Sequence, residues 1–101
     1  MEVEITPYAL RRLNSHFNFV FDKLEYTSEQ VEALESKLLG TAKGLSKNPK
    51  IGQFEIYLDH LEEGHRRVIV GQYKIIYYIT EDKIIVSDFF DTRQDPNKMN
   101  R

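Results

Sequence analysis

The stretch HRRVIVGQYKIIYYITEDKIIVSDFFDTRQD, from His65 to Asp95, decides the fold of this chain. Its residues alternate between apolar and polar at 65–70, 73–80 and 83–90, as in half-buried β-strands, with two-residue turns at 71–72 and 81–82. Gly71 suits the first central position of a type II′ turn, because glycine adopts a positive φ at little cost. The stretch therefore predicts three consecutive antiparallel strands.

The turns also predict which residues face each other if the strands pair regularly. Counting from them, Arg67 faces Ile76, Ile76 faces Ser87 and Lys74 faces Phe89. Successive side chains point to opposite faces, so one face is apolar and the other is mixed. The apolar face receives Val68, Val70, Tyr73, Ile75, Tyr77, Ile79, Ile84, Val86 and Phe90. The mixed face receives His65, Arg67, Ile69, Lys74, Ile76, Tyr78, Lys83, Ile85, Ser87 and Phe89. Asp88 and Arg66 fall on the apolar face, where they either pair with each other or lie at its rim.

Two helices precede these strands. After a short strand at 3–5, Thr6 and Pro7 predict a helix N-cap and a proline at the first helical position, and an apolar stripe continues to about Leu24. Thr27 and Gln30 fit a capping box for a second helix that ends near residues 45–47. The run 54–58 predicts a further strand. The expected fold is α+β, with an N-terminal strand and an α-helical hairpin packed on a C-terminal antiparallel sheet.

Composition limits the classes of protein to consider. A length of 101 residues without a linker-like segment indicates a single domain, 1–101. There is no cysteine, which excludes disulfides and thiolate chemistry, and His16 and His60 have no metal-ligand spacing, so we expect no metal and no cofactor. No apolar run approaches the roughly 20 residues that span a bilayer, so a cytoplasmic protein is expected. The net charge of -2 requires any basic site to be local.

Two short motifs carry a family resemblance. Residues Val70 to Lys74, VGQYK, precede an aromatic-rich strand, and Asp91 to Pro96, DTRQDP, follow the last strand. Together with the helical hairpin they resemble the RelE/ParE toxins of bacterial type II toxin-antitoxin modules, over essentially the whole chain. The resemblance implies the toxin fold and a cognate antitoxin as partner. For antitoxin contact we take Phe19, Tyr78 and Phe89 as candidates, since Phe19 falls off the apolar stripe of its helix.

The resemblance leaves two activities open. RelE-like toxins are ribosome-dependent mRNA endoribonucleases, and Arg67, Lys74 and Arg93 are the candidate catalytic cations for such a reaction. Arg93 is expected to approach Lys74 across the sheet. These toxins also tend to be strongly basic and to carry a C-terminal catalytic tyrosine, whereas this chain is acidic and has no tyrosine after Tyr78.

Both departures favour the ParE-like branch, which the motif Arg93-Gln94-Asp95-Pro96 also resembles. ParE toxins inhibit DNA gyrase by binding it, so the leading prediction is a toxin that binds its target, with Arg67, Lys74 and Arg93 as contact candidates. The alternatives are the endoribonuclease, with ribosome and mRNA as partners, and an inactive relative that binds only antitoxin. Solvated surface cations explain Arg67 and Lys74 equally well.

Overall fold

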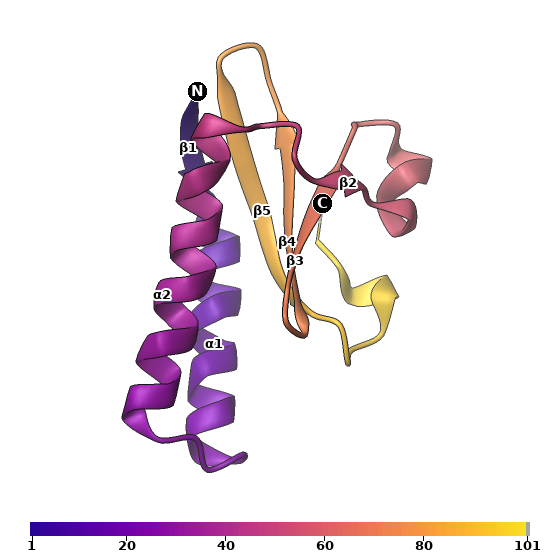
Figure 1. Cartoon of the computed structure of the whole chain (residues 1–101). Helices are drawn as coiled ribbons and strands as arrows, with labels where there is room; N and C mark the ends of the chain where they lie inside the picture. The colour runs from indigo at the N-terminus through magenta and orange to yellow at the C-terminus, as the bar shows by residue number, and fades with distance from the viewer. Residues whose placement is uncertain (101) are drawn as a thin grey trace.

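The computed structural model describes residues 1–100, in which two long helices form one layer against a β-sheet (Figure 1). The elements are β1 (Glu2–Ile5), α1 (Pro7–Asp22), α2 (Ser28–Gly44), β2 (Gln53–Phe54), β3 (Arg66–Val70), β4 (Tyr73–Ile79) and β5 (Lys83–Asp91). Short 3₁₀ helices follow at η1 (Leu45–Lys47), η2 (Ile56–Leu61) and η3 (Pro96–Lys98). No helix within residues 1–100 is long and apolar enough to cross a membrane.

Local capping chemistry sets the starts of both long helices. The Thr6 side chain accepts a hydrogen bond from the backbone N–H of Ala9 at 3.1 Å, and Pro7 occupies the first helical position. At α2, Thr27 Oγ1 accepts from the Gln30 N–H at 3.1 Å, while the Gln30 side chain accepts from the Thr27 N–H at 2.8 Å. Both predicted caps are confirmed, because they depend only on residues within one turn.

The strands of residues 1–100 form one five-stranded sheet in the order β1-β5-β4-β3-β2. The sheet is mixed, because β1 runs parallel to β5 while the other neighbours are antiparallel. The turn at 71–72 is confirmed, with Gly71 at a φ of +59°, and the β3–β4 register is as predicted, with Arg67 opposite Ile76. The expected α+β architecture and its N-terminal strand are confirmed, whereas the parallel pairing of β1 with β5 was not predicted from the sequence.

Register in the second hairpin departs from the prediction at one residue. Tyr77 faces Val86 as counted from the turn, but Ile76 faces Asp88, so Ser87 is the extra residue of a β-bulge. The predicted pairs of Ile76 with Ser87 and Lys74 with Phe89 are therefore wrong. Beyond the bulge every side chain of β5 points to the opposite face from the one predicted.

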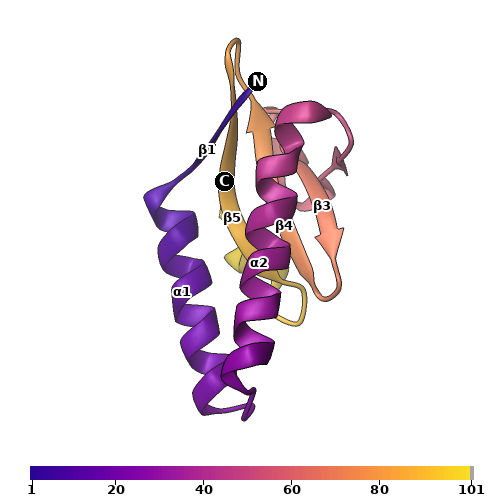
Figure 2. The ribbon, with the colours of Figure 1, turned by 60° about the vertical axis from the view of Figure 1, so that its left-hand side comes forward.

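The bulge divides the last two phenylalanines between two cores. Phe89 packs in the main core, which α1 and α2 form with the sheet, whereas Phe90 packs on the other face with Leu58, Ile76 and Met99. Figures 1 and 2 show both long helices on one face of the sheet. In Figure 1, η2 and η3 lie on the far side of the sheet from them. Phe90 was predicted on the helix-facing side and Phe89 on the mixed face, so both assignments are reversed.

The predicted strand at 54–58 is wrong. Only Gln53 and Phe54 pair with β3, and η2 begins at Ile56. The reason is Glu55, which is buried at 1% exposure. Its carboxylate accepts a hydrogen bond from the Tyr57 N–H at 3.1 Å and so caps the N-terminus of η2, which ends the strand at this residue.

The two charged residues predicted on the apolar face do not pair with each other. Arg66 donates to the carbonyl oxygen of Gly52 at 2.7 Å and stacks on Phe54. Asp88 is fully buried beyond the bulge, where it accepts from the Asn100 N–H at 2.9 Å and lies 3.7 Å from Arg12 Nε. Burial raises the pKa of Asp88, although the Asn100 hydrogen bond and the Arg12 charge act in the opposite direction.

Candidate functional site

Arg67 and Lys74 share the sheet face that carries η2, as predicted, but each is held by the chain itself. Lys74 Nζ donates to Glu55 Oε1 at 2.8 Å, and the side chain of Glu55 is fully buried. Arg67 donates to the Phe54 carbonyl oxygen and, at 3.1 Å, to Gln53 Oε1. Arg67 therefore holds β2, and Lys74 holds the residue between β2 and η2.

Arg93 lies on the other side of the sheet. Its guanidinium donates to both oxygens of Asp91, with Nε to Oδ1 at 2.9 Å and Nη2 to Oδ2 at 2.7 Å. Asp91 faces Tyr73 on the helix-facing side, because the bulge shifted the alternation of β5. The structure does not bring Arg93 to Lys74, and the three candidate cations do not converge on one point.

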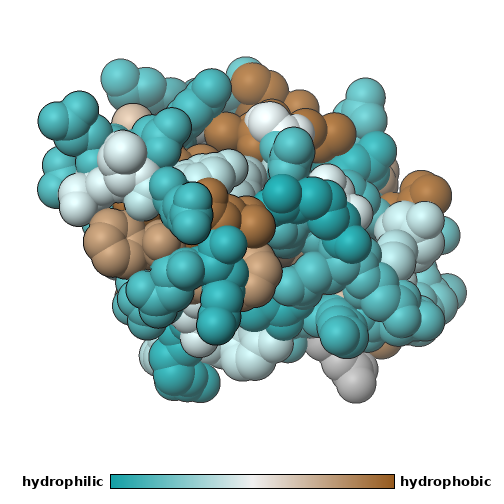
Figure 3. Space-filling model, turned by 90° about the horizontal axis from the view of Figure 1, so that it is seen from below, coloured by the Kyte–Doolittle hydropathy of each residue, from teal (hydrophilic) through white to brown (hydrophobic). Residues whose placement is uncertain are grey.

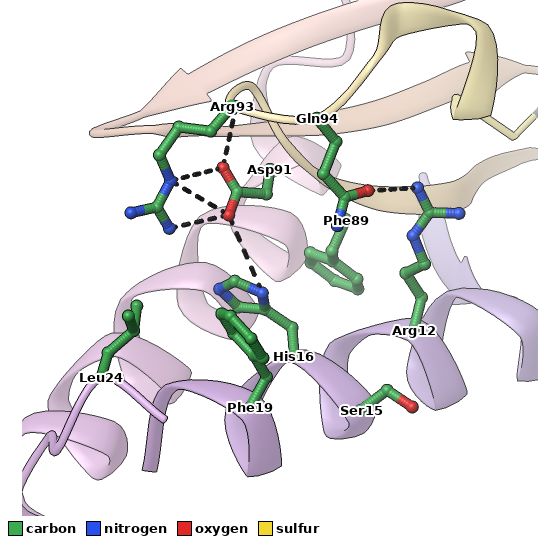
Figure 4. A pocket seen from close by; sticks show the side chains of 9 residues that line it. All are labelled: Arg12, Ser15, His16, Phe19, Leu24, Phe89, Asp91, Arg93 and Gln94. Atoms are coloured by element: carbon green, nitrogen blue, oxygen red, sulfur yellow. Dashed lines mark hydrogen bonds and ion pairs between the residues drawn. The ribbon is translucent and has the colours of Figure 1, made fainter. Parts of the chain in front are cut away.

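A cleft between α1 and the end of β5 gathers different polar groups (Figure 4). We call it the α1–β5 cleft; its volume is about 510 Å³ and it is lined by Arg12, Ser15, His16, Phe19, Leu24, Phe89, Asp91, Arg93 and Gln94. Arg93 and Asp91 project from the end of β5 toward His16 on α1. Volumes of this size are typical of small-ligand and side-chain pockets.

His16 connects the cleft to the sheet. Its Nε2 lies 2.7 Å from Tyr73 Oη, and its Nδ1 lies 3.9 Å from Asp91 Oδ2, beyond hydrogen-bonding distance. Burial lowers the pKa of His16, and this outweighs the opposing attraction of Asp91. The imidazole is therefore neutral at pH 7.

Asp91 is ionised and already paired. Burial alone raises the pKa of its carboxyl group, but hydrogen bonds from the side chain and backbone of Arg93 outweigh that effect and lower it. Burial, followed by the Asp91 charge, raises the pKa of Tyr73, so the phenol stays protonated. At this end of the cleft, His16 and Tyr73 are thus uncharged, and Arg93 and Asp91 form an ion pair with each other.

The three candidates for antitoxin contact lie in two places. Phe19 is 50% exposed and Phe89 is 4% exposed, and both line the α1–β5 cleft, Phe19 at its wall and Phe89 at its floor. Tyr78 lies on the opposite sheet face, with its ring 5.1 Å from that of the buried His65. The structure thus joins Phe19 and Phe89 and separates them from Tyr78.

Sequence reasoning missed His16, Asp91 and Arg12 as cleft residues. His16 was considered only for metal-ligand spacing, and no group of His, Asp and Glu within residues 1–100 is arranged to hold a metal ion. The side of the sheet on which Asp91 lies follows from the bulge, which regular alternation hides. The sequence did offer one signal. Phe17 belongs to the buried stripe of α1, and His16 directly precedes it, so the imidazole ring is expected at the edge of the core.

A comparison with protein families gives a match over nearly the whole chain. Residues 3–96 match the model described as ParE toxin of type II toxin-antitoxin system, parDE. A search of curated proteins gave no match.

Proposed function

The chain belongs to the ParE toxin family of type II toxin-antitoxin systems, and on this premise we propose that it arrests growth by binding a target protein such as DNA gyrase, and that its cognate antitoxin prevents this. A partner antitoxin is implied by the family itself. The identity of the target and the mode of neutralisation are the proposal.

The three candidate cations are held by contacts within the chain and do not converge, which supports target binding over RNA cleavage. Cleavage by attack of a 2′-hydroxyl needs cations that are free to stabilise the phosphorane and that converge on it. Lys74 is instead paired with a buried carboxylate, Arg67 is bonded to the neighbouring strand, and Arg93 is on the other side of the sheet. A toxin without such a centre acts by occupying a surface of its target.

A second argument comes from the overall charge. A chain with a net charge of -2 has no long-range field that draws it to ribosomal RNA. A protein target requires only local complementarity. That the protein is a single domain, 1–101, and acts in the cytoplasm is part of the proposal.

The experiment is induced expression of the toxin without antitoxin, scored in parallel for growth, transcript integrity and DNA supercoiling. We expect growth arrest with intact transcripts, loss of supercoiling by purified gyrase on addition of the toxin, and copurification of the toxin with gyrase. Transcripts cut at codons during translation would overturn the proposal in favour of the endoribonuclease. Harmless expression would favour an inactive relative that binds only antitoxin.

A variant of Arg93 sharpens this test. The endoribonuclease requires that Arg93→Gln abolish toxicity through loss of catalysis, with transcripts spared. Target binding predicts that transcripts stay intact in the wild type and in every variant. Circular dichroism of each variant separates loss of fold from loss of activity.

A further inference from the structure

The most exposed apolar side chains gather at the β2 edge of the sheet. Within residues 1–100, the four large apolar side chains with the highest exposed fractions, from 58% to 70%, are Ile51, Phe54, Ile56 and Ile69. Phe54 belongs to β2, Ile51 and Ile56 lie close to β2 on either side along the chain, and Ile69 is on β3, which pairs with β2. Figure 1 shows this edge on the opposite side of the sheet from β1. We call these four residues the β2-edge patch.

An exposed apolar group alone does not identify a binding surface. Seen from below, the protein carries apolar groups at several places between hydrophilic ones (Figure 3). Single exposed apolar side chains of this kind are normal on a protein surface. Several of them on adjacent segments of the chain are different, because an apolar area of this kind marks a site where another molecule binds.

A groove gives the β2-edge patch a specific shape. β2 pairs with Arg66 and Arg67 of β3, and at one end of this pairing a groove of about 250 Å³ lies between residues 51–53 and 67–69. Ile51 lines the groove from one side and Ile69 from the other. A groove of this size accepts one large apolar side chain of a partner, and such an anchored side chain typically contributes much of the binding energy of an interface.

The charge around the patch is positive. The segments that carry the patch contain the cations Lys50, Arg66 and Arg67. The two guanidinium groups donate to backbone carbonyl oxygens and to a side-chain amide, all of them uncharged, and within residues 1–100 none of the three cations forms an ion pair. The one acid of these segments, Glu55, is paired with Lys74 instead. An acidic partner therefore gains the attraction of three cations that have no carboxylate partner in the chain.

We propose that the β2-edge patch is the surface with which the toxin contacts its protein target. The target places a large apolar side chain in the groove beside Ile69 and carboxylates near Lys50 and Arg67. This inference rests on the proposed function in taking a protein as the target, and it adds the surface and the chemistry of the contact.

Two other occupants fit this surface less well. A two-fold contact between two copies of the chain would bring two sets of three cations together. A nucleic acid needs aromatic rings on which its bases stack, whereas three of the four patch side chains are aliphatic. The ring of the fourth, Phe54, is already covered by the Arg66 guanidinium, which lies 4.1 Å from the ring centroid.

The test measures the affinity of toxin variants for purified gyrase by titration calorimetry in the absence of DNA. Ile56→Ser and Ile69→Ser are each expected to weaken binding by about tenfold or more. Leu10→Ser is the matched control, because it removes an apolar side chain of α1 that is 40% exposed and lies outside the patch, and it should bind as the wild type does. Thermal unfolding followed by circular dichroism should give all three variants the Tm of the wild type.

Salt tests the ionic part of the contact. The affinity of the wild type should fall as salt is raised, and more steeply than that of Lys50→Gln, whereas Lys37→Gln, which removes an exposed lysine of α2, should follow the wild type. Unchanged binding by Ile56→Ser and Ile69→Ser, or equal salt dependence of Lys50→Gln and the wild type, would overturn the inference. Binding that requires DNA, or a dimer of the toxin alone that Ile69→Ser dissociates, would overturn it as well.

Growth assays separate this inference from the proposed function. Induced Ile56→Ser and Ile69→Ser should no longer arrest growth, at the protein level of the wild type. Arrest equal to that of the wild type would overturn the patch as the target surface and leave target binding intact. If the wild type arrests growth without binding gyrase, gyrase is excluded as the target, and loss of arrest in the patch variants alone still supports the patch. Harmless expression of the wild type would overturn both.

Discussion

Lys74→Ala should destabilise the protein strongly, although it removes a single lysine near the surface. The change leaves the fully buried carboxylate of Glu55 without the ammonium group that lies 2.8 Å from it. Removal of one partner of a buried ion pair typically costs about 3–5 kcal/mol in the free energy of unfolding. For a chain of this size, each kcal/mol lowers Tm by about 4–8 °C, so a decrease of more than about 12 °C is expected.

The assay is urea unfolding followed by circular dichroism, with Lys83→Ala as the matched control. Lys83 pairs with Glu4 at 3.4 Å, but both side chains are substantially exposed, so its loss should cost about 0–1 kcal/mol. The double variant Glu55→Gln/Lys74→Met should recover most of the lost stability, because no uncompensated charge stays buried. Under target binding, this double variant also arrests growth.

Equal losses for Lys74→Ala and Lys83→Ala would refute the reasoning, because they would mean that the Glu55 pair contributes no more than a solvated one. A stable Lys74→Ala variant that has lost toxicity would return Lys74 to the candidates for catalysis or for target contact, and transcript integrity would distinguish the two.

Four further predictions concern pH, a buried hydroxyl group, a closely packed glycine and a helix cap. Since burial lowers the pKa of His16 below 6.5, the unfolded chain takes up that proton at higher pH than the folded chain. In urea unfolding, the stability of the wild type should therefore fall relative to that of His16→Gln as the pH is lowered through about 6.5, and parallel pH profiles would contradict this. The Tyr77 hydroxyl accepts from the Gly52 N–H at 2.9 Å and donates to the carbonyl oxygen of residue 49 at 2.8 Å, so Tyr77→Phe should cost about 1–3 kcal/mol in thermal unfolding, and a wild-type Tm would contradict it. Gly52→Ala should also lower Tm, because its Cβ would lie 2.7 Å from the Arg67 carbonyl oxygen, whereas Gly40→Ala in α2 meets nothing within 4 Å and should not. Thr27→Ala should cost about 1 kcal/mol in urea unfolding through loss of the capping box, and no change would mean that α2 is held by packing alone.

The accuracy of the sequence predictions follows the range of the interactions involved. Thr6, Thr27 and Gly71 were interpreted correctly because caps and tight turns depend on a few consecutive residues. The strand predicted at 54–58 failed because Glu55 is held by Lys74, which is 19 residues away. The pattern of apolar and polar residues at 54–58 carries no information about a contact with a residue so far away in the sequence.

The candidate site was predictable only in part, for the same reason. The shared face of Arg67 and Lys74 followed from one regular hairpin. Asp91 beside His16 required the bulge and the packing of α1 on β5, which are properties of the folded chain. Phe19 was identified because its position off the helical stripe is visible in the sequence, whereas the cleft beside it is not.

Ser87 has a consequence for how the chain length can vary among related toxins. Between Ile84 and Asp91 it is the only residue of β5 that has no partner on β4, so a relative that lacks it would keep Phe89, Phe90 and Asp91 on their present sides, with a spacing to Val86 shorter by one. β4 has no unpaired residue of this kind. A gain or loss of one residue in β4 would therefore move every side chain on one side of the change to the opposite face of the sheet. Alignments of this family should therefore tolerate a single-residue gap at this point of the last strand and at no point in the strand before it.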